Sequence, residues 1–369
     1  MTAPSKVKLN PGDTIGILGG GQLGRMLALA AARLGLKCHV YSPDPDSPAF
    51  DVVQRATCAE YADVAALELF AADVDVVTYE FENVPSGTAM ILAARRPVLP
   101  DPAVLQITQD RLAEKDFVRK LGIGTADYAD VTSLEGLKQA VLKIGLPAVL
   151  KTRRFGYDGK GQVLIRASNG LKEIWDELGT HAAILEAFVP FEREISVVAA
   201  RGFDGHVECY DVTENEHRDH ILKFSHVPAN IPDELAAQAR DITRRIADAF
   251  DYTGVLAVEM FVQNGTELLV NEIAPRVHNS GHWTLDGASV SQFEQHIRAI
   301  AGWPLAPQQR HGAVTMTNLI GSDIEGYADW LAKPGATVHL YGKGPAREGR
   351  KMGHVTEVRP AEKPAKTPV

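Results

Sequence analysis

The segment that decides how this chain folds is Asn271-Glu272-Ile273-Ala274-Pro275-Arg276-Val277-His278-Asn279-Ser280-Gly281-His282-Trp283-Thr284. Only a short strand, up to about Ile273, can precede Pro275, because proline lacks the N–H group that a strand ladder needs. Irregular backbone must follow, and polar groups crowded onto a loop after a strand usually face a ligand. The segment therefore predicts a binding site, with a polar surface loop as the alternative.

A metal site is predicted where this segment meets the apolar run just upstream. The run from Val255 to Val262 reads as a strand and contains one acid, Glu259. An unpaired buried carboxylate is costly, so Glu259 needs a partner. Magnesium shared by Glu259 and Glu272 would meet that need, since hard cations prefer oxygen ligands and accept phosphate oxygens as the rest of their shell.

These residues resemble the metal- and phosphate-binding end of the ATP-grasp ligases. Among those, the run from Asn271 to Thr284 is similar to the 5-(carboxyamino)imidazole ribonucleotide synthetases of bacterial and fungal purine synthesis. The resemblance covers almost the whole chain and includes four further blocks in the right order. They are Gly19-Gly20-Gly21-Gln22-Leu23-Gly24-Arg25-Met26, Glu80-Phe81-Glu82-Asn83-Val84-Pro85, Gly156-Tyr157-Asp158-Gly159-Lys160-Gly161-Gln162 and Gly349-Arg350-Lys351-Met352-Gly353-His354.

The resemblance implies an α/β fold of ATP-grasp architecture in three parts. These are a Rossmann-like parallel-sheet domain over 1–107, a linker helix and small α+β lid over 108–190, and a C-terminal α/β domain over 191–369. ATP would lie between the last two. The implied reaction uses ATP and bicarbonate, by way of carboxyphosphate, to carboxylate 5-aminoimidazole ribonucleotide. Its products are 5-(carboxyamino)imidazole ribonucleotide, ADP and phosphate, and a homodimer is a family expectation.

Composition limits the function classes. A length of 369 residues favours two or three domains. The net charge of −9 argues against general nucleic-acid binding, which depends on neutralising phosphates. Three widely spaced cysteines in apolar surroundings, Cys38, Cys58 and Cys209, indicate a reducing cytoplasm. Residues 1–13 lack the apolar core of a signal peptide, and the apolar run 26–32 is too short to cross a membrane.

The order of elements supports this class. Strands expected at 14–18, 38–41 and 74–78 alternate with helices at 23–34 and 64–71, which predicts a parallel sheet with right-handed crossovers. Further helices are expected at 110–121, 234–250 and 292–301, and further strands at 149–152, 161–166, 182–188, 194–198 and 255–262. A mixed segment runs from 311 to about 360, and the tail beyond 359 is expected to be frayed.

The glycine turn at 19–24 follows a strand and precedes a helix, so on its own it fits a dinucleotide-binding fingerprint. A dinucleotide site also needs an acid after the second strand, and the proline-broken loop 41–48 places Asp44 poorly for that role. The turn can equally hold the 5′-phosphate of a ribonucleotide. The resemblance places Gly21, Gln22 and Leu23 at that substrate.

Acids at 80–85 follow a strand at the carboxyl end of the predicted sheet, where such sheets bind ligands. The resemblance favours Glu80 as a contact to the substrate ribose; a capping or loop acid is the alternative, more so for Glu82. In an otherwise acidic chain, Arg350 and Lys351 form a basic pair between glycines. Either could clamp the substrate phosphate, or the pair could be a solvated turn.

Lys151 precedes a glycine-rich turn suited to cover phosphates, although a simple hairpin is the alternative. That turn, the expected ATP lid, comprises Gly156, Tyr157, Asp158, Gly159, Lys160, Gly161 and Gln162. The resemblance places Lys115 and Lys151 on the phosphates, and Arg111, His217 and Asn271 elsewhere at the nucleotide. It also places Glu194 at the ATP ribose; the alternative is a solvated strand acid. At the adenine it places the main chain of Glu186, Ala187, Phe188 and Val189.

The reacting groups are expected on the first segment. Arg276 would stabilise charge on the acyl phosphate and, with Tyr157, touch the ribonucleotide. His278 and Asn279 would orient bicarbonate or the amine. Three alternatives remain: a formate-dependent ligase such as a glycinamide ribonucleotide transformylase, a nicotinamide-dependent oxidoreductase built on the glycine turn, and a nucleotide-binding regulator without catalysis.

Overall fold

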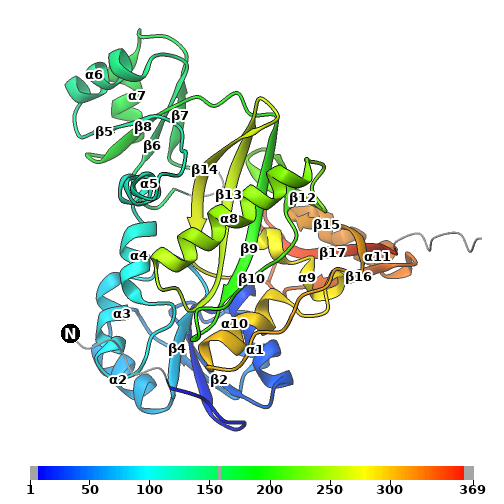
Figure 1. The fold of residues 1–369 in the computed structure, drawn as a ribbon. Helices are drawn as coiled ribbons and strands as arrows, with labels where there is room; N and C mark the ends of the chain where they lie inside the picture. Colours follow the sequence, from blue (N-terminus) through cyan, green and yellow to red (C-terminus); the bar gives the residue numbers. More distant parts are fainter. Residues whose placement is uncertain (1–6, 157–158, 361–369) are drawn as a thin grey trace, which may run out of the picture.

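The computed structural model describes residues 7–156 and 159–360, which form three β-sheets and the helices packed against them (Figure 1). The first sheet has the order β3-β2-β1-β4, and all its strands are parallel, as predicted. Its strands are β1 (Thr14–Leu18), β2 (Lys37–Ser42), β3 (Arg55–Cys58) and β4 (Val76–Tyr79). Its helices are α1 (Gln22–Arg33), η1 (Phe50–Val52), α2 (Val64–Ala72), α3 (Ser86–Ala93) and α4 (Pro102–Thr108).

A small antiparallel sheet of order β5-β8-β6-β7 stands at the top of Figure 1. The helix α5 (Arg111–Lys120) leads to it. Apolar residues of α6 and α7 bury themselves against its strands and give it a core of its own. Its elements are β5 (Tyr128–Val131), α6 (Leu134–Ile144), β6 (Ala148–Thr152), β7 (Gln162–Ile165), α7 (Leu171–Leu178) and β8 (Ala183–Ala187).

The third sheet is the largest, with the order β14-β13-β9-β11-β12-β15-β17-β16 and β10 beside β9. Its strands are β9 (Arg193–Arg201), β10 (Val207–Cys209), β11 (Thr213–Arg218), β12 (Ile221–Val227), β13 (Gly254–Gln263), β14 (Glu267–Ala274), β15 (Gly312–Ile320), β16 (Ala336–Leu340) and β17 (Lys351–Pro360). Its helices are α8 (Asp233–Ala249), η2 (Asn279–Gly281), α9 (Thr284–Gly287), α10 (Gln292–Ile300), η3 (Gly321–Gly326) and α11 (Tyr327–Ala332).

Strand alternation gives this sheet two apolar faces. Val197 and Val258 share one core with residues of α8, whereas Val198 and Ala257 share another with residues of α10 and α1. The second core therefore joins the large sheet to the first one. His296 of α10 strengthens that joint, because its Nε2 lies 2.8 Å from Thr78 Oγ1 and its Nδ1 accepts from the Val255 N–H at 3.1 Å.

Each sheet lies within one of the three segments predicted as domains, and the boundaries themselves stay a prediction. All three cysteines are free; Cys38 and Cys209 are buried, but Cys58 is exposed, so the expected apolar surroundings are wrong there. Within the described ranges, no helix combines the length and the apolar character that crossing a bilayer requires.

Candidate active site

Two carboxylates face each other across the first pair of strands in the large sheet. Glu259 of β13 is the register partner of Glu272 of β14, which confirms that they lie on neighbouring strands. Burial and the nearby charge of Glu272 raise the pKa of Glu259 to about 8. A desolvated acid repelled by a half-exposed neighbouring acid forms a site that a divalent cation would stabilise.

The donor set fits magnesium only with help from a substrate. No group of three His, Cys, Asp or Glu side chains converges on a metal position in residues 7–156 and 159–360. Magnesium is commonly held by one or two carboxylates together with phosphate oxygens, so Glu259 and Glu272 suffice as the protein's share.

Arg276 joins these carboxylates to the first sheet. Its guanidinium forms an ion pair with Glu82, which follows β4, and Nη1 donates to the Val277 carbonyl at 3.0 Å. Burial alone would raise the pKa of Glu82, but Arg276 outweighs it and holds that pKa below its usual range. Glu82, interpreted from sequence as a loop acid, is therefore part of the site.

The glycine turn after β1 binds the side chain of Glu80 through two backbone N–H groups. The Gly21 N–H donates to Glu80 Oε1 at 2.9 Å, and the Gly24 N–H donates to Glu80 Oε2 at 3.0 Å. A side chain at Gly21 could not coexist with this contact, because its Cβ would lie 2.7 Å from Glu80 Oε1. These two amides are therefore engaged by a carboxylate within the protein, and the substrate contact expected at Gly21, Gln22 and Leu23 stays a prediction.

Glu80 is almost fully buried between this turn and the cations of the site. Burial raises the pKa of Glu80, while the two amide hydrogen bonds, Arg276 and Lys343 act in the opposite direction. Gln22 and Leu23, the other residues predicted at the substrate, open α1; Gln22 is half-buried and Leu23 is buried. Lys343 carries no sequence signal that would have marked it.

Two lysines predicted to hold ATP phosphates meet on one carboxylate. Lys151 Nζ lies 2.8 Å from Glu186 Oε2, and Lys115 Nζ lies 3.5 Å from Glu186 Oε1. Burial would raise the pKa of Glu186, but the two lysines lower it to about 2. Burial lowers the pKa of Lys115, which also donates to the Asn271 carbonyl at 3.5 Å. The side chain of Glu186 thus has a role that the sequence assigned only to its main chain.

Arg111 links the glycine-rich turn after β6 to Glu272. Its Nη2 donates to the Gly156 carbonyl at 3.4 Å, and its Nη1 lies 3.5 Å from Glu272 Oε2. On the same helix, buried Glu114 accepts from the Ile273 N–H at 3.1 Å. Burial and the charge of Glu272 raise the pKa of Glu114 to about 8. Helix α5 therefore brings one cation and one acid to Glu272.

The glycine turn predicted as the ATP lid runs from β6 to β7. Gly161 has φ +70°, and a Cβ there would lie 2.7 Å from Thr152 Oγ1, so the turn requires glycine. A Cβ at Gly159 would lie 2.6 Å from His220 Cβ, which places the turn against the β11–β12 connection. Lys160 is exposed and Gln162 begins β7, whereas Tyr157 and Asp158 lie outside the described residues.

Two of the backbone N–H groups predicted to contact adenine are hydrogen-bonded within the protein. The Ala187 N–H donates to the Asp127 carbonyl at 2.7 Å, and the Phe188 N–H donates to the Pro147 carbonyl at 3.1 Å. These two amides are therefore not open to a base edge. Val189 is buried next to them.

Glu194 and His217, both predicted at the nucleotide, form an ion pair across β9 and β11. Burial would lower the pKa of His217, but Glu194 outweighs burial and raises it. Glu194 thus has a partner in the fold, so the alternative of a solvated strand acid is wrong.

His278 lies next to Glu259. Its Nε2 lies 3.3 Å from Glu259 Oε1, and its Nδ1 lies 2.8 Å from Ser280 Oγ. Burial and the charges of Arg276 and Lys351 keep the pKa of His278 well below its usual range, so the ring is neutral. Asn279 follows it, and both of its side-chain amide atoms are buried without a hydrogen-bond partner among the described residues. The Asn271 side-chain oxygen is in the same state, which is what a ligand-binding amide would show in a ligand-free structure.

The basic pair lies at the start of the last strand. The charge of Lys351, the first residue of β17, acts to lower the pKa values of both Glu82 and His278, so Lys351 lies within electrostatic range of both. Arg350 precedes the strand, and its N–H donates to the Arg347 carbonyl at 3.0 Å. Lys351 is therefore the member of the pair that the fold brings to Glu82.

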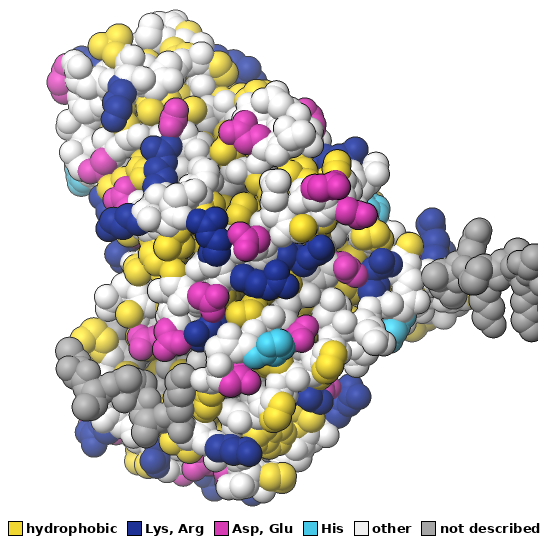
Figure 2. Space-filling model, viewed as in Figure 1, with side chains coloured by type: hydrophobic (Ala, Val, Ile, Leu, Met, Phe, Trp, Pro, Cys, Tyr) yellow, Lys and Arg dark blue, Asp and Glu magenta, His cyan; other side chains and the backbone are white. Residues whose placement is uncertain are grey.

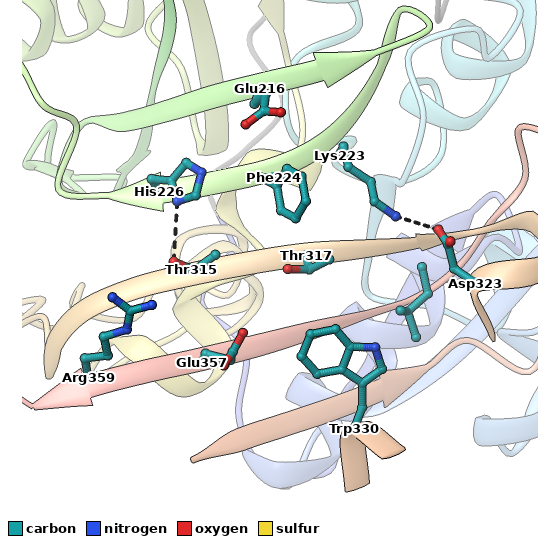
Figure 3. A pocket seen from close by; sticks show the side chains of 11 residues that line it. Glu216, Lys223, Phe224, His226, Thr315, Thr317, Asp323, Trp330, Glu357 and Arg359 are labelled. Atoms are coloured by element: carbon teal, nitrogen blue, oxygen red, sulfur yellow. Dashed lines mark hydrogen bonds and ion pairs between the residues drawn. The ribbon is translucent and has the colours of Figure 1, made fainter. Parts of the chain in front are cut away.

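Charged side chains of both signs gather at the narrowing between the small upper sheet and the body of the molecule in Figure 2. A separate hollow of about 510 Å³ lies over β11, β12, β15 and β17 and contains none of the predicted site residues (Figure 3). An ion pair of 2.5 Å between Lys223 Nζ and Asp323 Oδ2 closes one end of it. The hollow is therefore not the candidate site.

Three family models match the chain in succession. They are the ribonucleotide synthetase preATP-grasp domain over residues 13–109, the ATP-grasp domain over 116–293 and the phosphoribosylaminoimidazole carboxylase C-terminal domain over 314–366. The N5-carboxyaminoimidazole ribonucleotide synthase of Brucella melitensis biotype 1 is 50% identical over 357 residues, covering 96% of this chain and 99% of the relative. That of Bacillus subtilis is 41% identical over 360 residues, covering 97% and 94%.

Solved structures agree with these relatives. The ADP complex of an N5-carboxyaminoimidazole ribonucleotide synthetase superposes with a TM-score of 0.92 at 42% identity, covering 97% of this chain and 94% of that one. The Aspergillus clavatus enzyme in complex with ADP and 5-aminoimidazole ribonucleotide gives a TM-score of 0.88 at 30% identity, covering 95% and 94%.

Proposed function

We propose that this chain, which belongs to the N5-carboxyaminoimidazole ribonucleotide synthase family of ATP-grasp ligases, reacts its substrates between Glu259, Glu272 and Arg276. It catalyses the ATP-dependent carboxylation of 5-aminoimidazole ribonucleotide in purine biosynthesis, forming a carbon–nitrogen bond. The observation that carries this assignment of the site is the direct pairing of Glu259 with Glu272, within electrostatic range of Arg111 and Arg276.

The carboxyl donor is bicarbonate, and the chemistry runs in two steps. An oxygen of bicarbonate attacks the γ-phosphorus of ATP, giving carboxyphosphate and ADP. The exocyclic amine of the ribonucleotide then attacks the carboxyl carbon, the carbon–oxygen bond breaks, and phosphate leaves as the nitrogen gives up a proton. Both steps concentrate negative charge, so fixed positive groups contribute most to catalysis.

The ATP end of the site combines cations with two acids. Lys115 and Lys151 take the phosphates, with Glu186 balancing their charge in the empty enzyme. Glu259 and Glu272 hold magnesium, which when bound supplies positive charge opposite the phosphate oxygens. Arg111 contacts both the lid turn and Glu272, so a movement of the turn would shift the guanidinium that lies beside this carboxylate.

The ribonucleotide end lies toward the first sheet. Glu80, fixed by two amides, faces the ribose, and Lys351 takes the phosphate beside Glu82. Arg276 stabilises charge on the acyl phosphate, and the unpartnered amide of Asn279 orients bicarbonate or the amine. We place the enzyme in the cytoplasm, since its three cysteines are free, and the homodimer expected from the resemblance stays a prediction.

Turnover with two carbon donors separates this reaction from that of a formate-dependent ligase. ADP and phosphate should form with bicarbonate and the ribonucleotide together, and formate should not replace bicarbonate. ATP consumption that formate supports equally well would reject the proposed carboxyl donor.

Oxygen-18 bicarbonate tests the route through carboxyphosphate. The bridging oxygen comes from bicarbonate and leaves with phosphate, so one labelled oxygen is expected in the phosphate released, under conditions that limit exchange with water. Unlabelled phosphate formed at full rate, with stoichiometric carbamate, would eliminate carboxyphosphate while leaving the fold assignment intact.

A further inference from the structure

A row of polar residues crosses the interior of the large sheet. Glu272, Glu259 and Ser196 occupy paired positions on β14, β13 and β9. Asn215 of β11 and Ser225 of β12, paired with each other, extend the row diagonally, because the register partner of Ser196 on β11 is Thr213. Ser196 and Ser225 are fully buried and Asn215 is 6% exposed. Buried polar side chains destabilise an apolar sheet unless they are hydrogen-bonded.

The hydroxyl and amide groups of this row form one hydrogen-bonded chain that ends on the candidate site. Ser225 Oγ donates to Asn215 Oδ1 at 2.9 Å, and Asn215 Nδ2 donates to Ser196 Oγ at 2.9 Å. Ser196 Oγ then donates to Ser280 Oγ at 2.7 Å. Ser280 Oγ lies 2.8 Å from His278 Nδ1. The chain thus leads from the middle of the sheet to the imidazole beside Glu259.

Hydroxyls and side-chain amides can face either way, so the direction of these hydrogen bonds must be fixed by a group of known polarity. The surroundings of the His278 ring supply it. The backbone N–H of Ser280 also donates to His278 Nδ1, at 3.3 Å, so Nδ1 is an acceptor. At the other side of the ring, Nε2 faces a Glu259 oxygen at 3.3 Å. A neutral imidazole carries one N–H, and accepting at Nδ1 leaves that hydrogen on Nε2.

The ring is also held by its own backbone. The His278 N–H donates to Gln292 Oε1 at 2.9 Å, and Gln292 Nε2 donates to the His278 carbonyl at 2.7 Å. Gln292 is fully buried. The imidazole therefore sits in a fixed place, and the Ser280 N–H together with the hydrogen-bonded series that ends on Ser280 Oγ determines which of its nitrogens carries the hydrogen.

We propose that Ser225, Asn215, Ser196 and Ser280 are positioning residues that hold His278 as its Nε2–H tautomer, with that nitrogen facing Glu259 and not acting as a base. The inference rests on the proposed function, in which Glu259 binds the metal. Groups that orient a ligating carboxylate commonly change activity ~10–100-fold when removed. The amine must then lose its proton to a group other than the Nε2 of His278.

The tautomer can be measured directly on the full chain labelled with ¹⁵N-histidine, without substrates. The His278 signals, identified by their loss in His278→Gln, should show an unprotonated Nδ1 and a protonated Nε2. A protonated Nδ1 would overturn the proposal. This result does not depend on the reaction, whereas absence of ribonucleotide-dependent turnover would reject the proposed function instead.

Two variants test the series of hydrogen bonds that ends on His278. Ser280→Ala and Ser196→Ala should each lower kcat by ~10–100-fold, leave KM for ATP unchanged and populate the second tautomer of His278. The matched control is Thr243→Val on α8, which removes a fully buried hydroxyl that donates to the Ala239 carbonyl at 2.9 Å, on the other face of the sheet.

Thr243→Val should keep wild-type kcat and a single tautomer. Wild-type kcat and a single tautomer in both serine variants would overturn the proposal. An equal loss of kcat in Thr243→Val would overturn it as well, because the effect would then follow from any lost buried hydroxyl. The wild-type spectrum stays decisive even for a variant that does not fold.

Discussion

Arg276 and Glu82 form an ion pair between the end of the large sheet and the end of the first sheet, 194 residues apart in sequence. Their side chains are 15% and 31% exposed, so solvent screens the pair only in part. The same guanidinium lies near Glu80 and Glu272, whose charges raise the pKa of Arg276 against the effect of burial. One side chain thereby connects the proposed ribonucleotide end of the site to its proposed metal end.

Glu82→Gln should destabilise the protein by ~1 kcal/mol at neutral pH, a value discounted for partial exposure. Because Arg276 outweighs burial and lowers the pKa of Glu82, this stability is present above the unfolded pKa of 4.5 and is lost as the pH falls through the lower folded pKa. Urea unfolding of both proteins should give a constant difference above pH ~6 that narrows below 4.5. A difference that does not change with pH would contradict the ion pair as its cause.

Glu272→Gln should keep the fold and lower turnover by ~10²-fold, the scale of losing one key electrostatic group. The apparent affinity for magnesium in the presence of ATP should fall as well. Glu267→Gln on the same strand, where the side chain is exposed, is the matched control. Near-normal turnover of Glu272→Gln at saturating magnesium would show that Glu272 is not a ligand that matters.

Lys351→Ala should weaken ribonucleotide binding by ~1.5–3 kcal/mol, typical of a hydrogen bond to a charged group. ATP affinity should change little, because Lys351 lies on the Glu82 side of the site. Isothermal titration with each ligand separates the two effects, and Lys138→Ala on α6 serves as an exposed control. Equal loss for both ligands would point to misfolding or a wrong assignment.

Glu186→Gln should lower the unfolding free energy of the empty enzyme by ~3–5 kcal/mol, since two buried lysines lose their counter-charge. ATP phosphates can replace that charge, so ATP should raise the melting temperature of the variant more than that of the wild type. Melting curves with and without ATP measure this, with Glu173→Gln on α7 as the exposed lid control. Equal ATP-induced shifts would show that the lysines do not meet the phosphates.

Elements with a clear apolar period could be predicted from the sequence. The strand at 14–18 and the helix at 23–34 match β1 and α1 within about a residue, because short apolar runs there end in turn residues. The polar strand β11 (Thr213–Arg218) was not individually predicted. Its sequence, Thr-Glu-Asn-Glu-His-Arg, lacks an apolar face, and its place in the sheet comes from pairing with β9 and β12.

The candidate site is visible in the sequence where its residues cluster along the chain, as they do from Asn271 to Asn279. Pairings between distant segments carry no such pattern. Glu186 meets Lys151 across 35 residues, and Glu80 meets the Gly21 amide across 59. Ser196 and Asn215 could have been noticed in the sequence in one way. They are polar side chains inside or beside apolar strands, and such side chains need a buried partner.

The strand β17 lies between β15 and β16 in the sheet, although both precede it in the chain. A ribosome therefore exposes two strands whose shared neighbour has not yet been made. During that interval β15 presents an open edge, the kind to which foreign strands add. Lys351 opens the strand that closes this edge. For the nascent chain, synthesis of β17 therefore both covers this edge and adds the lysine proposed to hold the substrate phosphate.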